Sequence, residues 1–292
     1  DNQTTINITL KEAVGQLDEI VINAGYYNTT KKEATGSIVK VSAKDIENQP
    51  LVSPLQTLEG RMSGVTVTQA TSMPGSYTNI EIRGKNSLRG DGNYPLYVVD
   101  GIPVDSKPIS LSGLMAFGMD PLSSIGTNNI ESIEVLKDAD ATSIYGSRGA
   151  NGVVLITTKK GGAGKVTFNI NTYSGAGQVS NFIDVLNTKQ YLEMRNEAFT
   201  NDGASPGAYD YDLTVWNQNR NTDWQKVLYG GSALVNDVQA SLSGGNANIT
   251  FLAGGALHKE GTVFPGDFGY QKINGFVNIN HTSQNKKFKV LL

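Results

Sequence analysis

Cysteine is absent from this 292-residue sequence, which excludes a disulfide framework and thiolate metal ligands. Histidine is scarce, with His258 and His281 as the two in the sequence, both in its second half. So few imidazoles do not predict a histidine metal cluster or a catalytic triad. Basic and acidic residues number 24 and 27, and the net charge of −3 does not predict a surface for nucleic acid.

Long apolar runs are also missing. No stretch approaches the roughly 18 apolar residues of a membrane-spanning helix, so a helical membrane protein is not expected. The alternating strands of a β-barrel leave little hydropathy signal and are compatible with this sequence. The chain does not begin with methionine, and it ends inside an apparent strand, Lys289–Leu292. We therefore expect it to be part of a longer protein.

Glycine, at 33 residues, is plentiful, and the first half of the chain has the pattern of a mixed α/β domain. The stretch Ile130–Gly161 predicts an alternating strand, a short helix, a glycine-rich turn and a second strand. Asp138 is placed to cap the helix and Gly146 to end it. The β-branched run Val153–Thr158 predicts a buried strand.

A helix and three more strands are expected upstream of this unit. Ser53, Pro54 and Gln56 form a capping box with proline at the first helical position. Leu55, Leu58 and Met62 then share one helical face, and Gly64 ends the helix. The expected strands are Val65–Thr68, Asn79–Arg83 and Leu96–Val99. Together these elements predict one domain over residues 31–163, called the mixed domain below.

After residue 163 the pattern changes to long alternating strands. Val166, Phe168 and Ile170 alternate with polar residues, and later segments repeat this pattern over about ten residues, the length that crosses a bilayer at a tilt. The connections are alternately long and short. The long one, Gly175–Ala233, contains a predicted helix at Lys189–Phe199, capped at Asn187 or Thr188. A soluble β-sandwich is the alternative that alternation alone leaves open. The expected strands are Lys165–Ser174, Leu234–Ser243, Asn248–Ala256, Gln271–Asn280 and Lys287–Leu292.

Three segments of the mixed domain, in order, carry a family resemblance: Asn79–Leu88 (NIEIRGKNSL), Pro95–Val104 (PLYVVDGIPV) and Ile130–Gly161. They resemble the plug domain of SusC/RagA-type TonB-dependent transporters of the bacterial outer membrane. The resemblance implies an α+β plug domain followed by antiparallel strands of a transmembrane β-barrel of about 22 strands. It further implies an integral outer-membrane location, with the plug on the periplasmic side of the barrel lumen.

The same resemblance divides the chain into four parts and places a TonB box at Asp18, Glu19, Ile20, Val21 and Ile22. TonB must add an extended segment to a sheet edge, which suits a β-prone and tethered stretch. The alternative is that these residues are one more strand of a preceding module. INAGYY, which follows the box, departs from the more usual VTG-type sequence and leaves the end of the box open. The expected parts are 1–17, the tail of a preceding β module; 18–30, the TonB box and a linker; 31–163, the plug; and 164–292, the first barrel strands with the first long extracellular loop.

Two arginines, Arg83 and Arg148, match plug arginines that in this family face acidic residues of the inner barrel wall. Such pairs would lock the plug reversibly, because partly buried ion pairs are poor permanent fasteners. The alternative is that each is a solvated surface arginine. Substrate-facing residues are expected on the plug loops and the long barrel loop, where aromatic and amide groups suit sugars and peptides almost equally. These are Ser72, Tyr77, Asn86, Arg89, Asp91, Asn93, Trp216 and Trp224. For Trp216 and Trp224 the alternative is that they pack the long loop internally.

The function implied is TonB-dependent import of an oligosaccharide or peptide nutrient, with TonB, a SusD-like surface lipoprotein and outer-membrane lipid as partners. The alternative is an outer-membrane scaffold or secretion-associated barrel with the plug as a static gate. No enzyme activity and no cofactor are expected. The stretch Gly161–Lys165 faintly resembles a phosphate loop, but Lys159 stands where its first glycine belongs and Val166 where its Ser/Thr belongs.

Overall fold

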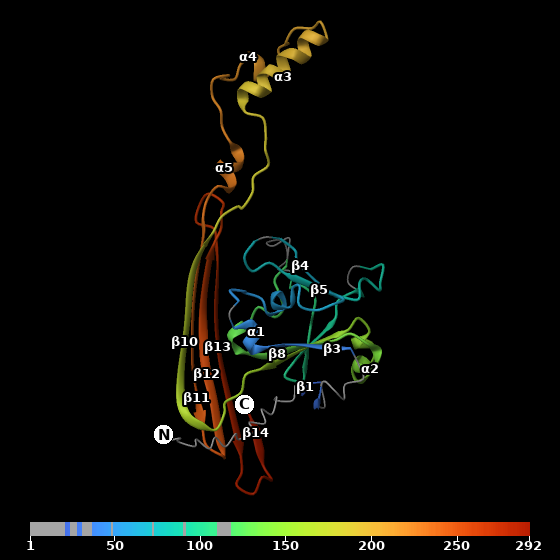
Figure 1. Cartoon of the computed structure of the whole chain (residues 1–292), viewed down its shortest axis with the longest axis vertical. Coiled ribbons are helices and arrows are strands. Elements are labelled where there is room, and N and C mark those ends of the chain that lie inside the picture. The colour runs from blue at the N-terminus through green and yellow to red at the C-terminus, as the bar shows by residue number, and fades with distance from the viewer. Residues whose placement is uncertain are drawn as a thin grey trace, which may run out of the picture.

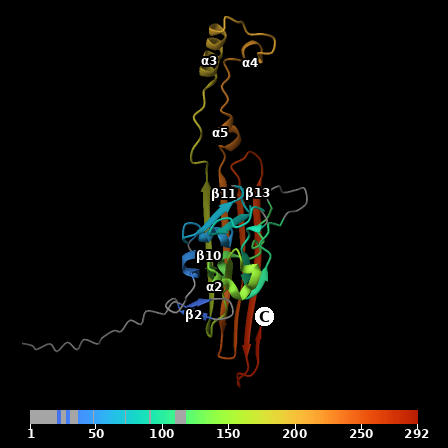
Figure 2. The same ribbon diagram turned by 90° about the vertical axis from the view of Figure 1, so that its right-hand side faces the viewer.

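The computed structural model contains two bodies: the mixed domain, and a sheet of long strands that we call the long-strand sheet (Figure 1). In the view at right angles the mixed domain lies in front of this sheet, so it covers one face (Figure 2). Among the described residues no helix is both long and apolar enough to span a membrane. The structure describes residues 21–23, 28–30, 37–47, 49–71, 73–89, 92–109 and 118–292.

A five-stranded sheet in the order β3-β8-β9-β6-β7 organises the mixed domain. β6 and β9 are parallel, and the other neighbours are antiparallel. The order leaves β3, the first of these strands along the chain, at one edge of the sheet. The strands are β3 (Ile38–Ser42), β6 (Leu96–Val99), β7 (Ile102–Val104), β8 (Ile130–Leu136) and β9 (Val153–Thr158).

β8, an interior strand of the sheet, is almost completely buried. From Ser132 to Leu136 every side chain is buried, because β3 and β9 flank the strand and apolar clusters cover both faces. The polar alternate position Glu134 is 0% exposed. It is accommodated by Lys40 Nζ at 3.4 Å and by a hydrogen bond from Ser132 Oγ, so the polar member of the alternation is paired inside the core.

The helix expected after Ser53 is much shorter than predicted: it is the single 3-10 helix η1 (Pro54–Leu58). The capping box is present, and Ser53 Oγ accepts a hydrogen bond from the Leu55 amide. The helix stops because Glu59 turns to extended backbone and Gly60 adopts a φ of +68°. The predicted apolar face nevertheless forms, since Leu55, Leu58 and Met62 are all buried.

The unit between β8 and β9 follows the predicted order. α2 (Ala139–Thr142) begins after Asp138, and Gly146 breaks the following turn η4 (Ser143–Gly149) at a φ of +58°. Asp138 occupies the N-cap position, but its side chain makes no capping hydrogen bond. The predicted N-cap position is therefore confirmed, while the carboxylate itself accepts from the Ser37 amide and pairs with Arg83.

Other elements of the mixed domain lie outside its sheet. A separate hairpin forms from β4 and β5, close to the expected strands, and Ile80 of β5 is fully buried in the core. The bounds are α1 (Ala43–Ile46), β4 (Val65–Gln69), β5 (Thr78–Ile82) and η3 (Thr127–Asn129).

The long-strand sheet is an antiparallel meander in the order β10-β11-β12-β13-β14. All five strands were expected, but four of them are 13 or 14 residues long, longer than the predicted ten. The pairing of β12 with β13 continues to Gly261 and Gly269, which shortens the connection expected between them. The strands are β10 (Gly164–Gly177), β11 (Ala233–Gly245), β12 (Ile249–Gly261), β13 (Gly269–Thr282) and β14 (Lys289–Leu291).

The face of this sheet turned away from the mixed domain is apolar. Phe168, Leu242, Ala253 and Val277 stand side by side in register across β10 to β13. Phe168 is 64% and Val277 66% exposed, so nothing in the described structure covers them. An exposed apolar face over strands of this length is the arrangement of a transmembrane β-barrel wall rather than of a soluble sandwich.

Residues 178–232, which connect β10 to β11, form a long excursion that extends beyond the end of the sheet (Figure 1). Its main helix is α3 (Thr188–Asn201), capped by Asn187 as expected; α4 (Tyr211–Thr214) and α5 (Trp224–Tyr229) follow. Arg195 of α3 joins the helices by pairing with Asp210 and Asp212 at 2.8 Å each. The hydrogen bond to Asp212 raises the pKa of the guanidinium and lowers that of the carboxyl.

The N-terminal end of the described chain is a two-stranded hairpin of β1 (Val21–Asn23) and β2 (Asn28–Thr30). The polar stretch after residue 22 was expected to be a linker, and the structure instead pairs residues 28–30 with 21–23. The hairpin lies at the side of the mixed domain that is turned away from the excursion (Figure 1).

Candidate functional site

The surface where the mixed domain meets the long-strand sheet is polar on the sheet side. Because side chains alternate along each strand, the residues opposite the apolar face all point toward the mixed domain. Asn171, Gln239 and Asn274 share one row across the sheet, with Ala256 between the last two. Tyr173, Asp237, His258 and Lys272 form the next row. We call this face the inner wall.

Lys272 of β13 fastens the mixed domain to the inner wall. Its Nζ donates to the carbonyl oxygens of Val52 and Ile125, each at 3.1 Å. The two carbonyls belong to segments 73 residues apart in the chain, just before η1 and just before η3. A cation that donates to two backbone oxygens makes stronger hydrogen bonds than a neutral donor would, and here they join two separate segments to one strand.

Backbone packing at the same strand is close. A side chain at Gly126 would place its Cβ 2.3 Å from the Asn274 amide nitrogen, and one at Gly75 would lie 2.3 Å from the Tyr270 ring. Both glycines therefore allow the mixed domain to approach β13 directly. Together with Lys272 they make β13 the main line of attachment.

Charged residues of the inner wall surround His258. Its Nδ1 lies 3.0 Å from Asp237 Oδ2 and its Nε2 3.3 Å from Glu260 Oε2. His258 and Asp237 are each 5% exposed. When both ring nitrogens carry protons, each of them can donate a hydrogen bond to one of the two carboxylates. Within the described residues no group of His, Asp and Glu has the arrangement of a metal site.

A buried carboxyl on the mixed domain faces this charged row. Asp120 is 3% exposed; its Oδ2 accepts from Ser53 Oγ at 2.5 Å and its Oδ1 from the Leu122 amide at 2.9 Å. Burial raises the pKa of Asp120, while the Ser53 and Leu122 hydrogen bonds and the charge of Lys272 oppose that rise. Ser53 follows Val52 directly, so the Lys272 and Asp120 contacts hold the same short segment.

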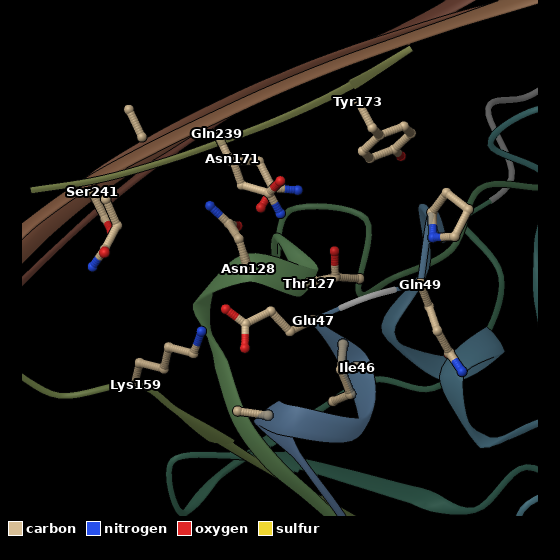
Figure 3. A pocket seen from close by; sticks show the side chains of 14 residues that line it. Ile46, Glu47, Gln49, Thr127, Asn128, Lys159, Asn171, Tyr173, Gln239 and Ser241 are labelled. Atoms are coloured by element: carbon tan, nitrogen blue, oxygen red, sulfur yellow. The ribbon is translucent and has the colours of Figure 1, made fainter. Parts of the chain in front are cut away.

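A cavity of about 480 Å³ lies between the mixed domain and the inner wall, on the side of Tyr173 away from the excursion. In Figure 3 Asn171 and Gln239 point from the wall toward Asn128 and Thr127 of the mixed domain. The mixed domain contributes Ala43, Ile46, Glu47, Gln49, Pro50, Thr127, Asn128 and Lys159; the wall contributes Asn169, Asn171, Tyr173, Gln239, Ala240 and Ser241.

The predicted TonB box lies only partly within the described structure. Val21 and Ile22 belong to β1 and pair with Thr30 and Thr29 of β2. Asp18, Glu19 and Ile20 lie outside the described residues. β1 is hydrogen-bonded to β2 along one of its two edges.

The two predicted locking arginines have different surroundings. Arg83 has a φ of +59° and pairs with Asp138 of the same domain, and its side chain is 56% exposed. Arg148 is exposed at the end of η4. In the described residues Arg83 thus has its acidic partner inside the mixed domain rather than on the wall.

The predicted substrate-facing residues of the mixed domain divide into two that hold its structure and two that are exposed, among those that the structure describes. Tyr77 is 5% exposed, and its hydroxyl donates to the Ser106 carbonyl, so it does not face solvent. Asn93 organises its loop by accepting from the Asn86 and Ser87 amides. Asn86 and Arg89 are exposed on that loop. Ser72 and Asp91 lie outside the described residues.

The two tryptophans of the excursion are exposed, Trp216 at 68% and Trp224 at 64%. They do not pack the excursion internally, which was the alternative to a binding role. Further exposed apolar side chains accompany them, including Ile183 at 77% and Val215 at 70%. An exposed set of this size is typical of a surface that contacts another protein or a ligand.

Sequence reasoning missed the attachment residues Lys272 and Asp120. Lys272 occupies a polar alternate position of a strand, where lysine is common without any partner. Asp120 follows the stretch Ser106–Met119, which predicts only a loop. A charged residue in the middle of a barrel strand, on the face toward the mixed domain, is the one available signal for Lys272.

Comparisons with known proteins agree with this arrangement. A family model described as the TonB-dependent receptor plug domain matches residues 30–153. The chain is 33% identical over 277 residues to TonB-dependent receptor SusC of Bacteroides thetaiotaomicron, a match that covers 94% of this chain and 24% of that protein. It is 36% identical over 264 residues to TonB-dependent receptor P26 of Formosa agariphila, covering 89% of this chain and 25% of that protein.

A solved structure shows the same fold. The structure of the RagAB peptide importer in the open-open state superposes with a TM-score of 0.73 at 26% identity, covering 91% of this chain and 30% of that one. The chain thus spans about a quarter of the length of the curated relatives it matches. Those relatives are named as receptors and the solved structure as an importer, not as enzymes.

A plug domain held on the polar face of a sheet whose other face is apolar defines the class of TonB-dependent outer-membrane receptors. The mixed domain is the plug domain, and the long-strand sheet is a fragment of the barrel. Within that class, the chain belongs to the SusC/RagA-type TonB-dependent transporters.

Proposed function

We propose that the protein imports an oligosaccharide or peptide nutrient across the bacterial outer membrane, driven by TonB and assisted by a SusD-like surface lipoprotein. The observation that carries this proposal is the arrangement of the plug domain. It is fastened to the inner wall, and its N-terminal hairpin lies at the side of the plug that is turned away from the excursion. A pull on the hairpin therefore acts along the barrel rather than across it.

The orientation follows from the same arrangement. The excursion of residues 178–232 is the long barrel connection, and the turns at the other end of the sheet are short. Outer-membrane barrels have long extracellular loops and short periplasmic turns. We therefore place the excursion outside the cell and the β1–β2 hairpin in the periplasm, where TonB acts.

TonB engagement is proposed at Asp18–Ile22. Strand addition needs an edge with free backbone groups, and β1 pairs with β2 on one edge. Four or five new hydrogen bonds of about 1 kcal/mol each would give a directional grip that can be released. The plug would then rearrange or partly unfold to open a path.

The exposed apolar side chains of the excursion are the proposed contact for the SusD-like lid and the cargo. Trp216 and Trp224 offer exposed aromatic faces on the excursion. On the plug, Asn86 and Arg89 are exposed on one loop. Arg148, exposed on the plug, remains our proposed lock toward acidic barrel residues, and Arg83 contributes through its pair with Asp138.

Deletion of Asp18–Ile22 from the full-length protein tests the proposal. Cells carrying the deletion are given a labelled pool of soluble oligosaccharides and, separately, a labelled tryptic peptide digest. Uptake of the transported pool is expected to fall to background, while the protein level in the membrane stays unchanged. The control deletion removes five residues upstream, Asn2–Ile6, and is expected to preserve uptake. Unchanged uptake after the box deletion would favour the scaffold or secretion alternative.

A further inference from the structure

A second, much smaller cavity lies at the attachment of the plug to β13. Its volume is about 20 Å³, which is enough for a water molecule and too little for a cargo group. Both bodies line it: Gly126 and Asn128 come from the plug, and Asp237, Ala256 and Lys272 come from the inner wall. We call this space the small cavity.

Two oxygen atoms at the small cavity are acceptors without a donor. Asp237 Oδ1 and Asn128 Oδ1 are both buried, and neither has a hydrogen-bond partner among the described residues. The other carboxylate oxygen of Asp237 is already bonded to His258 Nδ1, at 3.0 Å. Leaving a buried acceptor unpaired is costly, so two of them at one cavity indicate a bound molecule that donates twice.

Lys272 supplies a donor to the same place. An ammonium has three N–H donors, and two of those of Lys272 go to the carbonyls of Val52 and Ile125. Ile125 directly precedes Gly126, so the third donor lies beside the cavity lining. Asp237 stands in the same row of the wall, two strands away, and a partly buried ammonium is stabilised by such a negative charge.

Gly126 keeps the small cavity open. Its φ of −74° is one that any residue adopts, so the backbone conformation does not require glycine. A Cβ at this position would lie 2.3 Å from Asn128 Oδ1 and 2.3 Å from Asn274 Nδ2, far inside van der Waals contact. The glycine therefore leaves the Asn128 oxygen accessible from the cavity.

Water fits this set of groups better than a cation does. A buried water typically makes about three hydrogen bonds, and here two acceptors and one ammonium donor are available to it. A cation would lie beside the positive charge of Lys272, which repels it. The described residues also contain no group of His, Asp and Glu that could hold a metal ion.

We propose that one buried water molecule joins the plug to the inner wall, donating to Asp237 Oδ1 and Asn128 Oδ1 and accepting from Lys272 Nζ. Through this water the Asp237 carboxylate is the counter-ion of Lys272. Asn128 becomes a further contact of the plug with the wall, beside the two carbonyls that Lys272 binds directly. A water bridge is nearly as favourable in enthalpy as a direct hydrogen bond, so it strengthens the attachment. The water site goes beyond the proposed import and does not depend on it.

A structure of the full-length protein at a resolution that shows ordered solvent tests the site directly. We expect one solvent peak within hydrogen-bond distance of Asp237 Oδ1, Asn128 Oδ1 and Lys272 Nζ. Replacing sodium by rubidium in the buffer should leave this peak unchanged. Stronger density in rubidium would identify a cation and overturn the proposal, as would the lack of any peak or a direct bond between Asp237 and Lys272.

Ala256 of β12, which lines the small cavity, allows a test in solution. Ala256→Val and Ala256→Thr fill the cavity with nearly the same shape, but only threonine supplies a hydroxyl donor. We expect hydrogen–deuterium exchange of the η3 amides to be about tenfold faster in the valine variant than in the threonine variant, because valine leaves the acceptors unpaired. Equal exchange in the two would refute the need for a donor. Ala253→Val, on the outer face of the same strand, is the control and should match the wild type.

A double-mutant cycle shows whether the water joins Asn128 to Asp237. No direct hydrogen bond links these two side chains in the described structure, so without a bridge the effects of Asn128→Ala and Asp237→Ala on exchange of the η1 amides should multiply. With the bridge, each single change already breaks it, so the double variant should exchange at least about threefold more slowly than the product predicts. Simple multiplication of the two effects would refute the bridge.

Discussion

Replacement of Lys272 by methionine should loosen the plug from the wall at one defined place. The change removes two charge-assisted hydrogen bonds, to the carbonyls of Val52 and Ile125, worth about 1.5–3 kcal/mol each. Relief of the desolvation of a partly buried ammonium and the apolar packing of methionine offset part of this loss. A net loss of about 2 kcal/mol corresponds to a roughly 30-fold change in the local opening equilibrium.

Hydrogen–deuterium exchange of the full-length protein measures this opening. Amides of Ser53 and η1 become exposed when the segment detaches, so their exchange should accelerate about 30-fold. Amides of the β4–β5 hairpin, which Lys272 does not contact, should be unchanged. Lys259→Met is the matched control, because Lys259 stands on the neighbouring strand and its side chain points to the outer face.

Two results would refute the reasoning. Exchange at η1 within twofold of the wild type in Lys272→Met would show that the lysine does not fasten the plug. An equal acceleration in Lys259→Met would show that loss of any lysine from these strands destabilises the whole sheet.

Other predictions concern the plug core, a buried carboxyl and the excursion. Leu58→Ala should lower the free energy of unfolding of the plug by about 3 kcal/mol, measured by urea denaturation, because the side chain is 0% exposed. Asp120 has a pKa raised by burial, so its ionisation opposes folding: its stabilising contribution is present below the ordinary value of 3.8 and is lost as pH rises through the raised pKa. Asp120→Asn should therefore gain stability relative to the wild type as pH rises from 4 to 7, and a gap that shrinks over this range would contradict the assignment. Arg195→Ala should make the excursion more sensitive to trypsin by releasing Asp212, whereas Lys189→Ala, which removes another cation from the same helix, should not.

Much of the architecture was predictable because it follows local pattern. β6 was predicted to the residue, and α3 began at its Asn187 cap, because strand periodicity and capping are read from neighbouring residues. The two faces of the long-strand sheet followed from alternation at Val166, Phe168 and Ile170. The assignment as a barrel wall still needed the family resemblance, since a sandwich has the same period.

The contacts that the sequence did not predict join residues that lie far apart in the chain. Asp138 fits a helix cap locally, but Arg83, 55 residues earlier in the chain, and Ser37 compete for its carboxylate. The alternation of Ile130–Leu136 did not show that Glu134 is buried, which depends on Lys40 from the paired strand. Lys272 bonds to carbonyls more than a hundred residues away, and no spacing rule reports such a contact.

The two edge strands of the five-stranded sheet differ in a way that bears on how the plug domain refolds. β7 carries Pro103, which has no N–H to offer an incoming strand, so that edge does not accept additions. At the opposite edge, a chain in which β3 has not yet docked would present β8 with the backbone groups that face β3 unpaired. Such an open ladder is a template for one incoming strand, and Lys40 meets Glu134 only when that strand docks in register. The unpaired edge of β8 would thus guide β3 into the sheet, and the Lys40–Glu134 pair would favour the correct register.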